Sequence, residues 1–585
     1  MTDEWVRVGT PEEVAARGCT LVTAPGRAIA VFAVDGAFQA IDNRCPHMGF
    51  PLNRGTLRDG ILTCHWHHAR FDVTSGGTLD PFADDAPSFD TEVRDGAVWV
   101  RTRPRTQDAV ARTLQRIAEG LREDIGLVLA KGSVALQAAT ARDGTAWLAP
   151  ALATAAEYGC THRAGGWASG MTILTAMANV APALDAADRP LGLYHGLVHV
   201  ARDCDGQPPL VPQRALGGSR ATLDELGRWL RRSVEVRDED GARRVVLTAL
   251  ERGAGPAEMS AMTFAAATDH LYLSGGHALD FLNKAFELLE LIGWEHAPAV
   301  LTAALIPVSR ATRAEEASNW RQPVDLVELV ARAWSRADTL AAALAARPSG
   351  PADDLVPTLL GEDPAAAANA LVDALLGGRA PADLAQALAY AAALRMARFP
   401  TTNEFGDWIA VLHTFTYCNA LHQALLRAPT AELCRGLLHG AMAVHLDRFL
   451  NVPAARLPVA DPTRDGFPQA FLELLDAQQQ VEPAAQMVAS RLVHTDEGVV
   501  AALGRAVLRE DAEFHTYQTL EAAWRQYGGR RGTEEGRRIL VAASRYIAAH
   551  APTPRAMLRT AEIAERLHKG EALFENEAMD GAGPA

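Results

Sequence analysis

Two short motifs near the N-terminus carry the residue types best suited to metal chemistry. Cys45-x-His47 is followed, after 16 intervening residues, by Cys64-x-x-His67, so the chain offers two thiolates and two imidazoles. Thiolates suit iron bridged by sulfide, and imidazoles on one iron raise the reduction potential above that of an all-thiolate cluster. The alternative is a Cys₂His₂ zinc site, but such sites usually pair Cys-x-x-Cys with His-x₃₋₅-His.

These motifs resemble those of the Rieske [2Fe–2S] proteins. The resemblance is carried by Arg44-Cys45-Pro46-His47-Met48-Gly49, by Cys64-His65-Trp66-His67 and by Phe71-Asp72 after the second motif. It implies a [2Fe–2S] cluster whose ligands are Cys45, His47, Cys64 and His67, on two loops that we place at the tips of β-hairpins. The neighbouring His65 and His68 are expected to face solvent.

Within this family, the chain resembles the ferredoxin and oxygenase branch. The respiratory members carry an extra cysteine in each loop and a serine that hydrogen-bonds a cluster sulfide, whereas Phe50, Trp66 and Ala69 stand at those positions here. Fewer hydrogen bonds to sulfur leave the reduced cluster less stabilised, so a low potential is expected. His68 departs from the glycine that the family usually has.

The elements that would position these loops form a small antiparallel β domain. Between Trp5 and Arg103, short apolar runs are separated by turn signals, among them Asp-Gly pairs at 35–36, 59–60 and 95–96. Asp-Gly between apolar runs is a strong marker of a β-hairpin. We therefore predict an all-β domain over residues 1–103.

A large all-α domain is predicted for residues 106–585. The proline-containing stretch 101–105 ends the strand pattern, and the apolar residues that follow recur at helical spacing. Residues 347–354 form the strongest internal loop signal. They either divide the helical domain into two lobes or form one long surface loop.

Further histidines recur at helical spacing in this domain. His195, His199 and Asp203 fall on one helical face. At about 1.5 Å rise per residue the outer two lie about 12 Å apart, so only adjacent members can share one metal ion. The simpler interpretation is that each histidine forms a hydrogen bond within an Ala-rich core.

Residues from separate helices could together supply a 2-His-1-carboxylate iron site. His277 with Asp280 and Asp511 with His515 are further pairs at same-face spacing. We predict a catalytic centre that involves His195 and His199, with contributions from other helices by His277, His413 and His515. The expected cofactors are thus the [2Fe–2S] cluster and a second, non-haem iron site.

Three helical segments resemble, more diffusely, the questin oxidase-like proteins. They are Tyr194 to His199, Thr268-Asp269-His270 and His413 to His422, and the resemblance extends over most of residues 150–540. It implies monooxygenation, of the Baeyer–Villiger kind, of a polycyclic aromatic or polyketide-like substrate. The Asp-x₂-His-x₄₋₅-His motif of Rieske oxygenase α subunits is not found after residue 103, and a lone Glu565-x-x-His568 does not support a ferritin-like di-iron site.

The composition and the motifs that are absent limit which partners and which cellular location are expected. The net charge of −15 and the lack of a basic run exclude nucleic acid, and no signal peptide or long apolar stretch points to a membrane, so a cytoplasmic protein is expected. Seven scattered cysteines are unlike a disulfide framework. No Gly-x-Gly-x-x-Gly fingerprint follows a strand, which implies a separate ferredoxin reductase or NAD(P)H-dependent reductase.

Two functions fit these observations. In the first, the chain is an oxidoreductase whose Rieske domain passes electrons from the reductase to an oxygenase-type site in the helical domain, where a small-molecule substrate binds. In the second, it is an electron-transfer or redox-sensing protein whose helical domain is a docking module. A second iron site would distinguish the first from the second.

Overall fold

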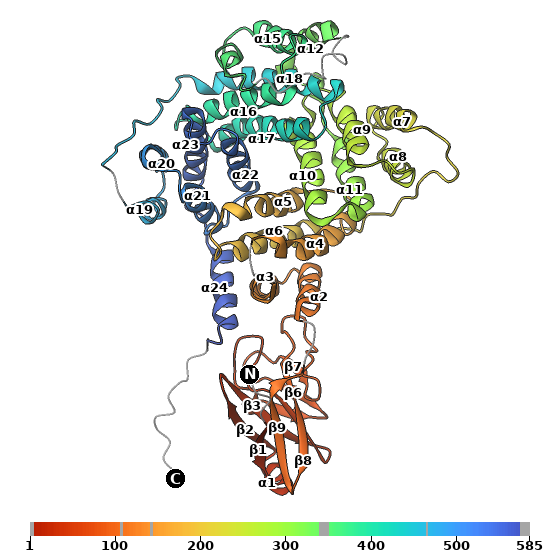
Figure 1. Ribbon diagram of the computed structural model, residues 1–585, viewed down its shortest axis with the longest axis vertical. Helices are drawn as coiled ribbons and strands as arrows, with labels where there is room; N and C mark the ends of the chain where they lie inside the picture. Colours follow the sequence, from red (N-terminus) through yellow and green to blue (C-terminus); the bar gives the residue numbers. More distant parts are fainter. Residues whose placement is uncertain are drawn as a thin grey trace. The chain divides into compact units, whose positions relative to one another are not determined.

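The computed structural model describes residues 5–105, 109–140, 144–337, 350–463, 466–571 and 573. The chain forms two compact units, Met1–Trp147 with Met557–Ala585 and Leu148–Ala556. The predicted fold class is confirmed, because an N-terminal β domain is followed by a large helical region (Figure 1). Residues 347–349 of the predicted internal loop lie outside the described residues, so a division into two lobes there stays a prediction.

The first unit contains two antiparallel sheets. One has six strands in the order β1-β9-β8-β4-β3-β2, and the other has three in the order β5-β6-β7. The strands are β1 (Trp5–Gly9), β2 (Cys19–Ala24), β3 (Arg27–Val34), β4 (Ala37–Asp42), β5 (Thr56–Arg58), β6 (Ile61–Thr63), β7 (Arg70–Asp72), β8 (Ser88–Arg94) and β9 (Ala97–Pro104). The helices of this unit are α1 (Pro11–Arg17), α2 (Ala109–Arg122), α3 (Gly126–Thr140) and α24 (Ala556–His568).

The three Asp-Gly pairs form the hairpin turns that the sequence predicts. They join β3 to β4, β5 to β6 and β8 to β9. Both residues of each pair have positive φ, for example 48° at Asp35 and 80° at Gly36. This is the geometry of a type I′ turn, whose twist matches that of the flanking strands.

The second unit is a helical assembly in which α17 packs against α10 and α22, and α5 packs against the same two helices. Its helices are α4 (Ala149–Thr161), α5 (Ser169–Val180), α6 (Arg189–Cys204), α7 (Leu223–Glu235), α8 (Glu239–Glu251), α9 (Pro256–Thr268), α10 (His277–Ile292), α11 (Ala297–Arg310), α12 (Leu326–Trp334), α14 (Val356–Leu359), α15 (Pro364–Leu376), α16 (Pro381–Ala397), α17 (Phe405–Arg427), α18 (Ala431–Leu446), α19 (Gln469–Leu474), α20 (Val481–His494), α21 (Val499–Leu508), α22 (Phe514–Gly528) and α23 (Glu534–Ala549). Among the described residues, no helix has the length and apolar character needed to span a bilayer.

Helices α5 and α6 approach so closely that glycine is required where they meet. A Cβ at Gly170 of α5 would lie 2.4 Å from the carbonyl carbon and oxygen of His199 on α6. A Cβ at Gly196 of α6 would lie 2.7 Å from Cα of Leu174 on α5. Because the added Cβ would clash with backbone atoms of the facing helix, no side-chain rotation can relieve the clash.

We expect Gly170→Ala to lower the free energy of unfolding by about 1–3 kcal/mol, the usual effect of forcing a methyl group into a filled interior. The midpoint of thermal unfolding, followed by far-ultraviolet circular dichroism, measures the change. Gly528→Ala is the matched control, since a Cβ there has no neighbour within 4 Å. Equal midpoints for the two variants would show that α5 and α6 can separate without loss of stability.

Candidate metal centres

Two loops with the same backbone hydrogen bonds carry Cys45 and Cys64. In each loop the cysteine N–H donates to the carbonyl five residues later, over 2.8 Å. The cysteine carbonyl accepts the N–H of the residue four positions later, Gly49 at 2.7 Å in the first loop and His68 at 3.0 Å in the second. These two residues both have positive φ, 88° for Gly49 and 62° for His68. The histidine that departs from the family pattern therefore keeps the loop geometry of a glycine.

The two cysteine sulfurs face each other and lie in backbone N–H cradles. The backbone N–H groups of Trp66 and His67 favour the Cys64 thiolate, and those of His47 and Met48 favour the Cys45 thiolate, although the hydrogen bond with Cys64 and burial raise the pKa of Cys45. A hydrogen bond from Cys45 is the largest of the effects that lower the pKa of the Cys64 thiol, to about 6. Donors aimed at sulfur favour the thiolate, which is the form that binds iron.

The two histidines of the motifs lie beside these sulfurs. The rings of His47 and His67 are 4.8 Å apart between centroids and nearly perpendicular. Burial, with the charges of His67 and Lys131, lowers the pKa of His47 to about 4, so this imidazole is neutral at neutral pH. Its Nδ1 is buried and has no hydrogen-bond partner among the described residues. Two cradled sulfurs and an unpartnered buried imidazole nitrogen fit a cluster of iron and sulfide.

Helices distant in sequence hold the first loop. The guanidinium of Arg44 donates to the carbonyl of Leu567, at the end of α24, over 2.9 Å and to that of Glu571 over 2.6 Å. Lys131 of α3 donates from Nζ to the Pro46 carbonyl over 2.7 Å. The residues on either side of Cys45 are therefore fixed by charged hydrogen bonds to helices outside the β domain.

Comparison with known proteins agrees with this geometry. The family model of the Rieske [2Fe-2S] domain matches residues 4–90. The ferredoxin component of the naphthalene 1,2-dioxygenase system of Pseudomonas aeruginosa is 32% identical over 79 residues, which are 14% of this chain and 76% of that protein. The chain belongs, through residues 4–90, to the Rieske [2Fe–2S] family. The Rieske domain implies a [2Fe–2S] cluster and supports a role in electron transfer.

Two further proteins match a similarly short part of the chain. Human apoptosis-inducing factor 3 is 34% identical over 80 residues, which are 14% of this chain, and the chain spans 13% of the length of that protein. A solved complex of reduced oxygenase and oxidized ferredoxin in carbazole 1,9a-dioxygenase matches with 25% identity and a TM-score of 0.18, covering 18% of this chain and 100% of the matched chain.

A second group of possible ligands lies in the helical unit. His277 at the start of α10, His413 in α17 and His515 in α22 bring one nitrogen each within 4.8 Å of one another. Nε2 of His413 lies 2.9 Å from Nε2 of His515. Burial is the main cause that lowers the pKa of His277 to about 4 and that of His413 to about 3. The neutral imidazoles of His277 and His413 are in the form that binds a metal ion.

Glu513 orients one of these imidazoles. Its carboxylate accepts a hydrogen bond from Nδ1 of His515 over 2.7 Å and from the hydroxyl of Tyr546 over 3.1 Å. Burial alone would raise the pKa of Glu513, but the hydrogen bonds and charge of His515, with the charge of His550, lower it to about 2. A carboxylate on Nδ1 leaves Nε2 of His515 facing the other two histidines, the usual arrangement behind a metal-binding histidine.

A strained turn precedes His277. Tyr272, Ser274, Gly275 and Gly276 all have positive φ, at 43°, 48°, 64° and 98°. Two of them are not glycine, so the turn stores backbone strain. Strain of this kind concentrates at functional sites, and here it sets the place where α10 begins and His277 points.

His195 and His199 lie outside this group of three. Nδ1 of His195 lies 2.7 Å from the hydroxyl of Tyr517, and the ring of His199 lies 5.5 Å from the same tyrosine. Nε2 of both histidines is buried without a hydrogen-bond partner among the described residues. Asp203, at the third position of this face, accepts hydrogen bonds from Ser169 and Gly170 at the start of α5. A role for His195 and His199 in the centre stays a prediction.

We expect Cys64→Ser to abolish the cluster, because a serine hydroxyl does not replace a thiolate on iron. His65→Ala is the control, since this exposed histidine hydrogen-bonds Thr56 and not the facing sulfurs. The rhombic electron paramagnetic resonance signal of the reduced protein, with sulfide analysis, measures the cluster. A signal that survives in Cys64→Ser, or zinc in the native protein, would contradict this ligand set.

The positive φ of His68 and Gly49 predicts opposite effects of two substitutions. A left-handed backbone conformation destabilises a non-glycine residue by about 1–2 kcal/mol. A substitution to glycine removes this strain but also stabilises the unfolded chain by increasing its entropy, so only part of the energy is gained. We expect His68→Gly to raise the stability of the Rieske domain by up to about 1 kcal/mol and Gly49→Ala to lower it by at least as much. The urea midpoint for loss of cluster absorbance measures both. Destabilisation by His68→Gly would contradict the strain argument.

Proposed function

We propose that this chain is an oxidoreductase in which a Rieske cluster passes electrons to a metal centre at His277, His413 and His515. The observation that carries the proposal is the convergence of three imidazoles from three helices in the same chain as a Rieske domain. A cluster transfers one electron at a time and performs no substrate chemistry, so an acceptor is required. A histidine-only centre differs from the 2-His-1-carboxylate set that the sequence suggests.

At the first centre, Cys45 and Cys64 would hold one iron of the cluster and His47 and His67 the other. The backbone N–H groups at each cysteine lower the energy of the thiolate form. Phe50, Trp66 and Ala69 supply no hydroxyl or disulfide, which supports a low potential. Electrons would come from a separate ferredoxin or NAD(P)H-dependent reductase.

At the second centre, the three imidazoles would bind a non-haem iron ion through Nε2 or Nδ1. When bound, iron supplies dioxygen activation, with two electrons and two protons consumed as one oxygen atom enters the substrate and the other becomes water. Glu513 holds His515 in the tautomer that presents Nε2. Phe281 and Phe514 lie 5.4 Å and 5.7 Å from the ring of His277 and provide apolar surface beside it. These rings support a small aromatic or polyketide-like substrate.

A second candidate is an electron carrier whose helical unit docks a partner. It is favoured by one observation: the naphthalene 1,2-dioxygenase relative is itself named a ferredoxin component. In that case the three histidines would bind no metal. The metal content of the protein separates the two candidates.

We expect one metal ion per chain beyond the two irons of the [2Fe–2S] cluster, lost in His277→Ala and His413→Ala, because each removes one of three ligands. Elemental analysis of anaerobically purified protein measures the content. The cluster signal should be unchanged in both variants. His199→Ala is the matched control, a histidine of the same unit outside the group.

Two results would contradict the proposal. If the native protein contains only the two irons of the cluster after iron is supplied, the electron carrier is the better description. If His199→Ala loses the additional metal and His277→Ala keeps it, the centre lies at α6 instead.

A further inference from the structure

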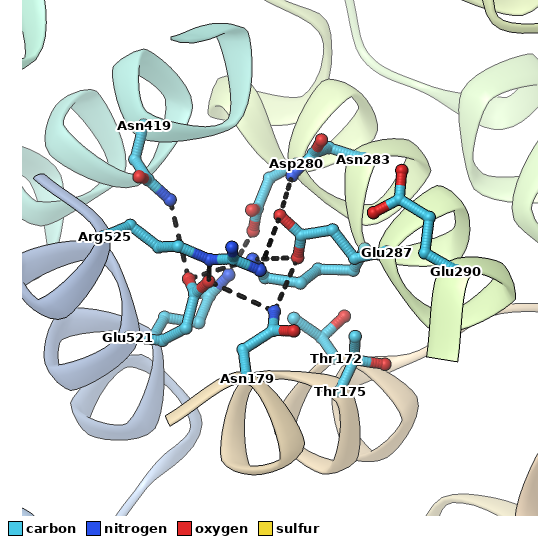
Figure 2. A network of polar contacts seen from close by, with 12 residues as sticks. Thr172, Thr175, Asn179, Asp280, Asn283, Glu287, Glu290, Asn419, Glu521 and Arg525 are labelled. Atoms are coloured by element: carbon cyan, nitrogen blue, oxygen red, sulfur yellow. Dashed lines mark hydrogen bonds and ion pairs between the residues drawn. The ribbon is translucent and has the colours of Figure 1, made fainter. Parts of the chain in front are cut away.

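A network of buried charges lies between α10, α22, α17 and α5 (Figure 2). Lys284 of α10 forms ion pairs with Glu287 at 2.8 Å and with Glu521 of α22 at 2.9 Å. Asn179 of α5 donates to both carboxylates, over 2.8 Å and 3.2 Å. Arg525 donates to Glu521 over 3.1 Å. In Figure 2 the labelled side chains of Asn179, Glu287, Glu521 and Arg525, from α5, α10 and α22, point toward one another.

Asp280 belongs to the same network and gives it an unbalanced charge. It is 2% exposed, and its carboxylate accepts a hydrogen bond from the amide of Gln518 on α22. With all groups ionised, the carboxylates of Asp280, Glu287 and Glu521 face the two cations Lys284 and Arg525, which leaves one negative charge in excess. The outer Glu290 and Arg427 pair with each other at 2.6 Å. An uncompensated charge in a helical interior is costly unless something neutralises it.

The position of Asp280 indicates what neutralises it. Asp280 follows His277 by three residues on α10, and Gln518 follows His515 by three residues on α22. Both pairs bridge the same two helices, so Asp280 and Gln518 lie about 4.5 Å along the helix axes from the histidine pair. The excess charge therefore sits one helical turn from the three histidines, and an imidazole ligand brings no negative charge to offset a divalent ion.

We infer that Asp280 supplies the negative charge that balances a divalent metal ion at His277, His413 and His515, and that it acts from one helical turn away and not as a ligand. The inference rests on the proposed function. Asp280 would act through its charge alone, because a nearby carboxylate lowers the energy of a cation that other side chains bind. Its carboxylate is outside the group of nitrogens that converge.

The protonation of Asp280 follows from this arrangement. Burial is the main cause that raises its pKa to about 7, opposed by Lys284 and reinforced by Glu521 and Glu287. The other labelled side chains of the network without a charge are Thr172, Thr175 and Asn179 from α5, Asn283 from α10 and Asn419 from α17, none of which ionises in this range (Figure 2). Without metal, Asp280 therefore holds a proton below neutral pH and is about half protonated at pH 7. A metal ion at the histidines favours the carboxylate, so binding is accompanied by transfer of that proton to the buffer.

The experiment compares Co²⁺ binding by the full chain, loaded with its iron–sulfur cluster but depleted of other metal, with binding by Asp280→Asn, Asp280→Glu and Glu290→Gln. Calorimetry in buffers of different ionisation enthalpy gives both the affinity and the protons released. His277→Ala identifies binding at other sites. Asparagine keeps the oxygen that accepts from Gln518, and far-ultraviolet circular dichroism checks that the helices are intact. Glu290→Gln removes an exposed carboxylate from the same helix.

We expect Asp280→Asn to weaken Co²⁺ binding at pH 8 by about 10–100-fold, the usual effect of removing an outer partner of a metal site. The difference from wild type should shrink toward pH 6. At pH 7 the wild type should release about half a proton more per Co²⁺ than Asp280→Asn, as a pKa of about 7 requires. Asp280→Glu should restore binding, and Glu290→Gln should match the wild type.

Three results would overturn the inference. If Asp280→Asn binds Co²⁺ as tightly as Glu290→Gln at pH 8, the carboxylate plays no part. If proton release is the same in wild type and Asp280→Asn, the proton comes from elsewhere. If wild type and His277→Ala bind equally weakly, the proposed centre itself is wrong, which distinguishes failure of the proposed function from failure of the role of Asp280.

Discussion

The ion pairs of Lys284 join the two helices that carry His277 and His515. Lys284 is 1% exposed and binds Glu287 of its own helix and Glu521 of α22. Burial alone would lower the pKa of Lys284, but the nearby carboxylates hold it above its usual range, so the ammonium stays charged. Because a buried charge must keep its partners, the pairing fixes α10 against α22 in rotation and in register. His277 and His515, on the same two helices, meet only in that register.

In the Rieske domain, backbone groups stabilise the buried negative charge of the thiolates. Two thiolates must be held together in a protein interior, and in each loop the N–H groups that follow the cysteine supply the compensation. Such a loop needs a left-handed residue four positions after the cysteine, which is Gly49 in one loop and His68 in the other. Arg44 and Lys131 then attach the first loop to helices, so the metal site is stabilised from both sides of Cys45.

Local patterns in the sequence predicted the β domain, its Asp-Gly turns and the Rieske motifs, since each depends on residues a few positions apart. Contacts between residues distant in the sequence could be predicted only in part. His277, His413 and His515 were predicted as contributors to one centre built around His195 and His199, but no local pattern indicates that these three converge as a group apart from those two. Glu513 was missed, and Asp511 was chosen as the partner of His515 by helical spacing. Helix α22 begins at Phe514, so both residues precede it and helical spacing does not apply to either. Asp203 shares a face with His199, yet its carboxylate serves the start of α5.

Stability alone does not explain a charged interior beside three imidazoles. Replacing a buried ion pair by apolar side chains of the same volume is often neutral or stabilising, so stability does not require charges between α10 and α22. An apolar core would, however, leave a divalent ion at the histidines without a compensating charge in a medium of low dielectric constant. With all groups ionised, the network instead carries one negative charge in excess, and Asp280 lies three residues from His277 on α10. The inferred metal ion would account for the composition of the network, because the ion pairs of Lys284 hold the other two carboxylates and leave Asp280 to balance the cation.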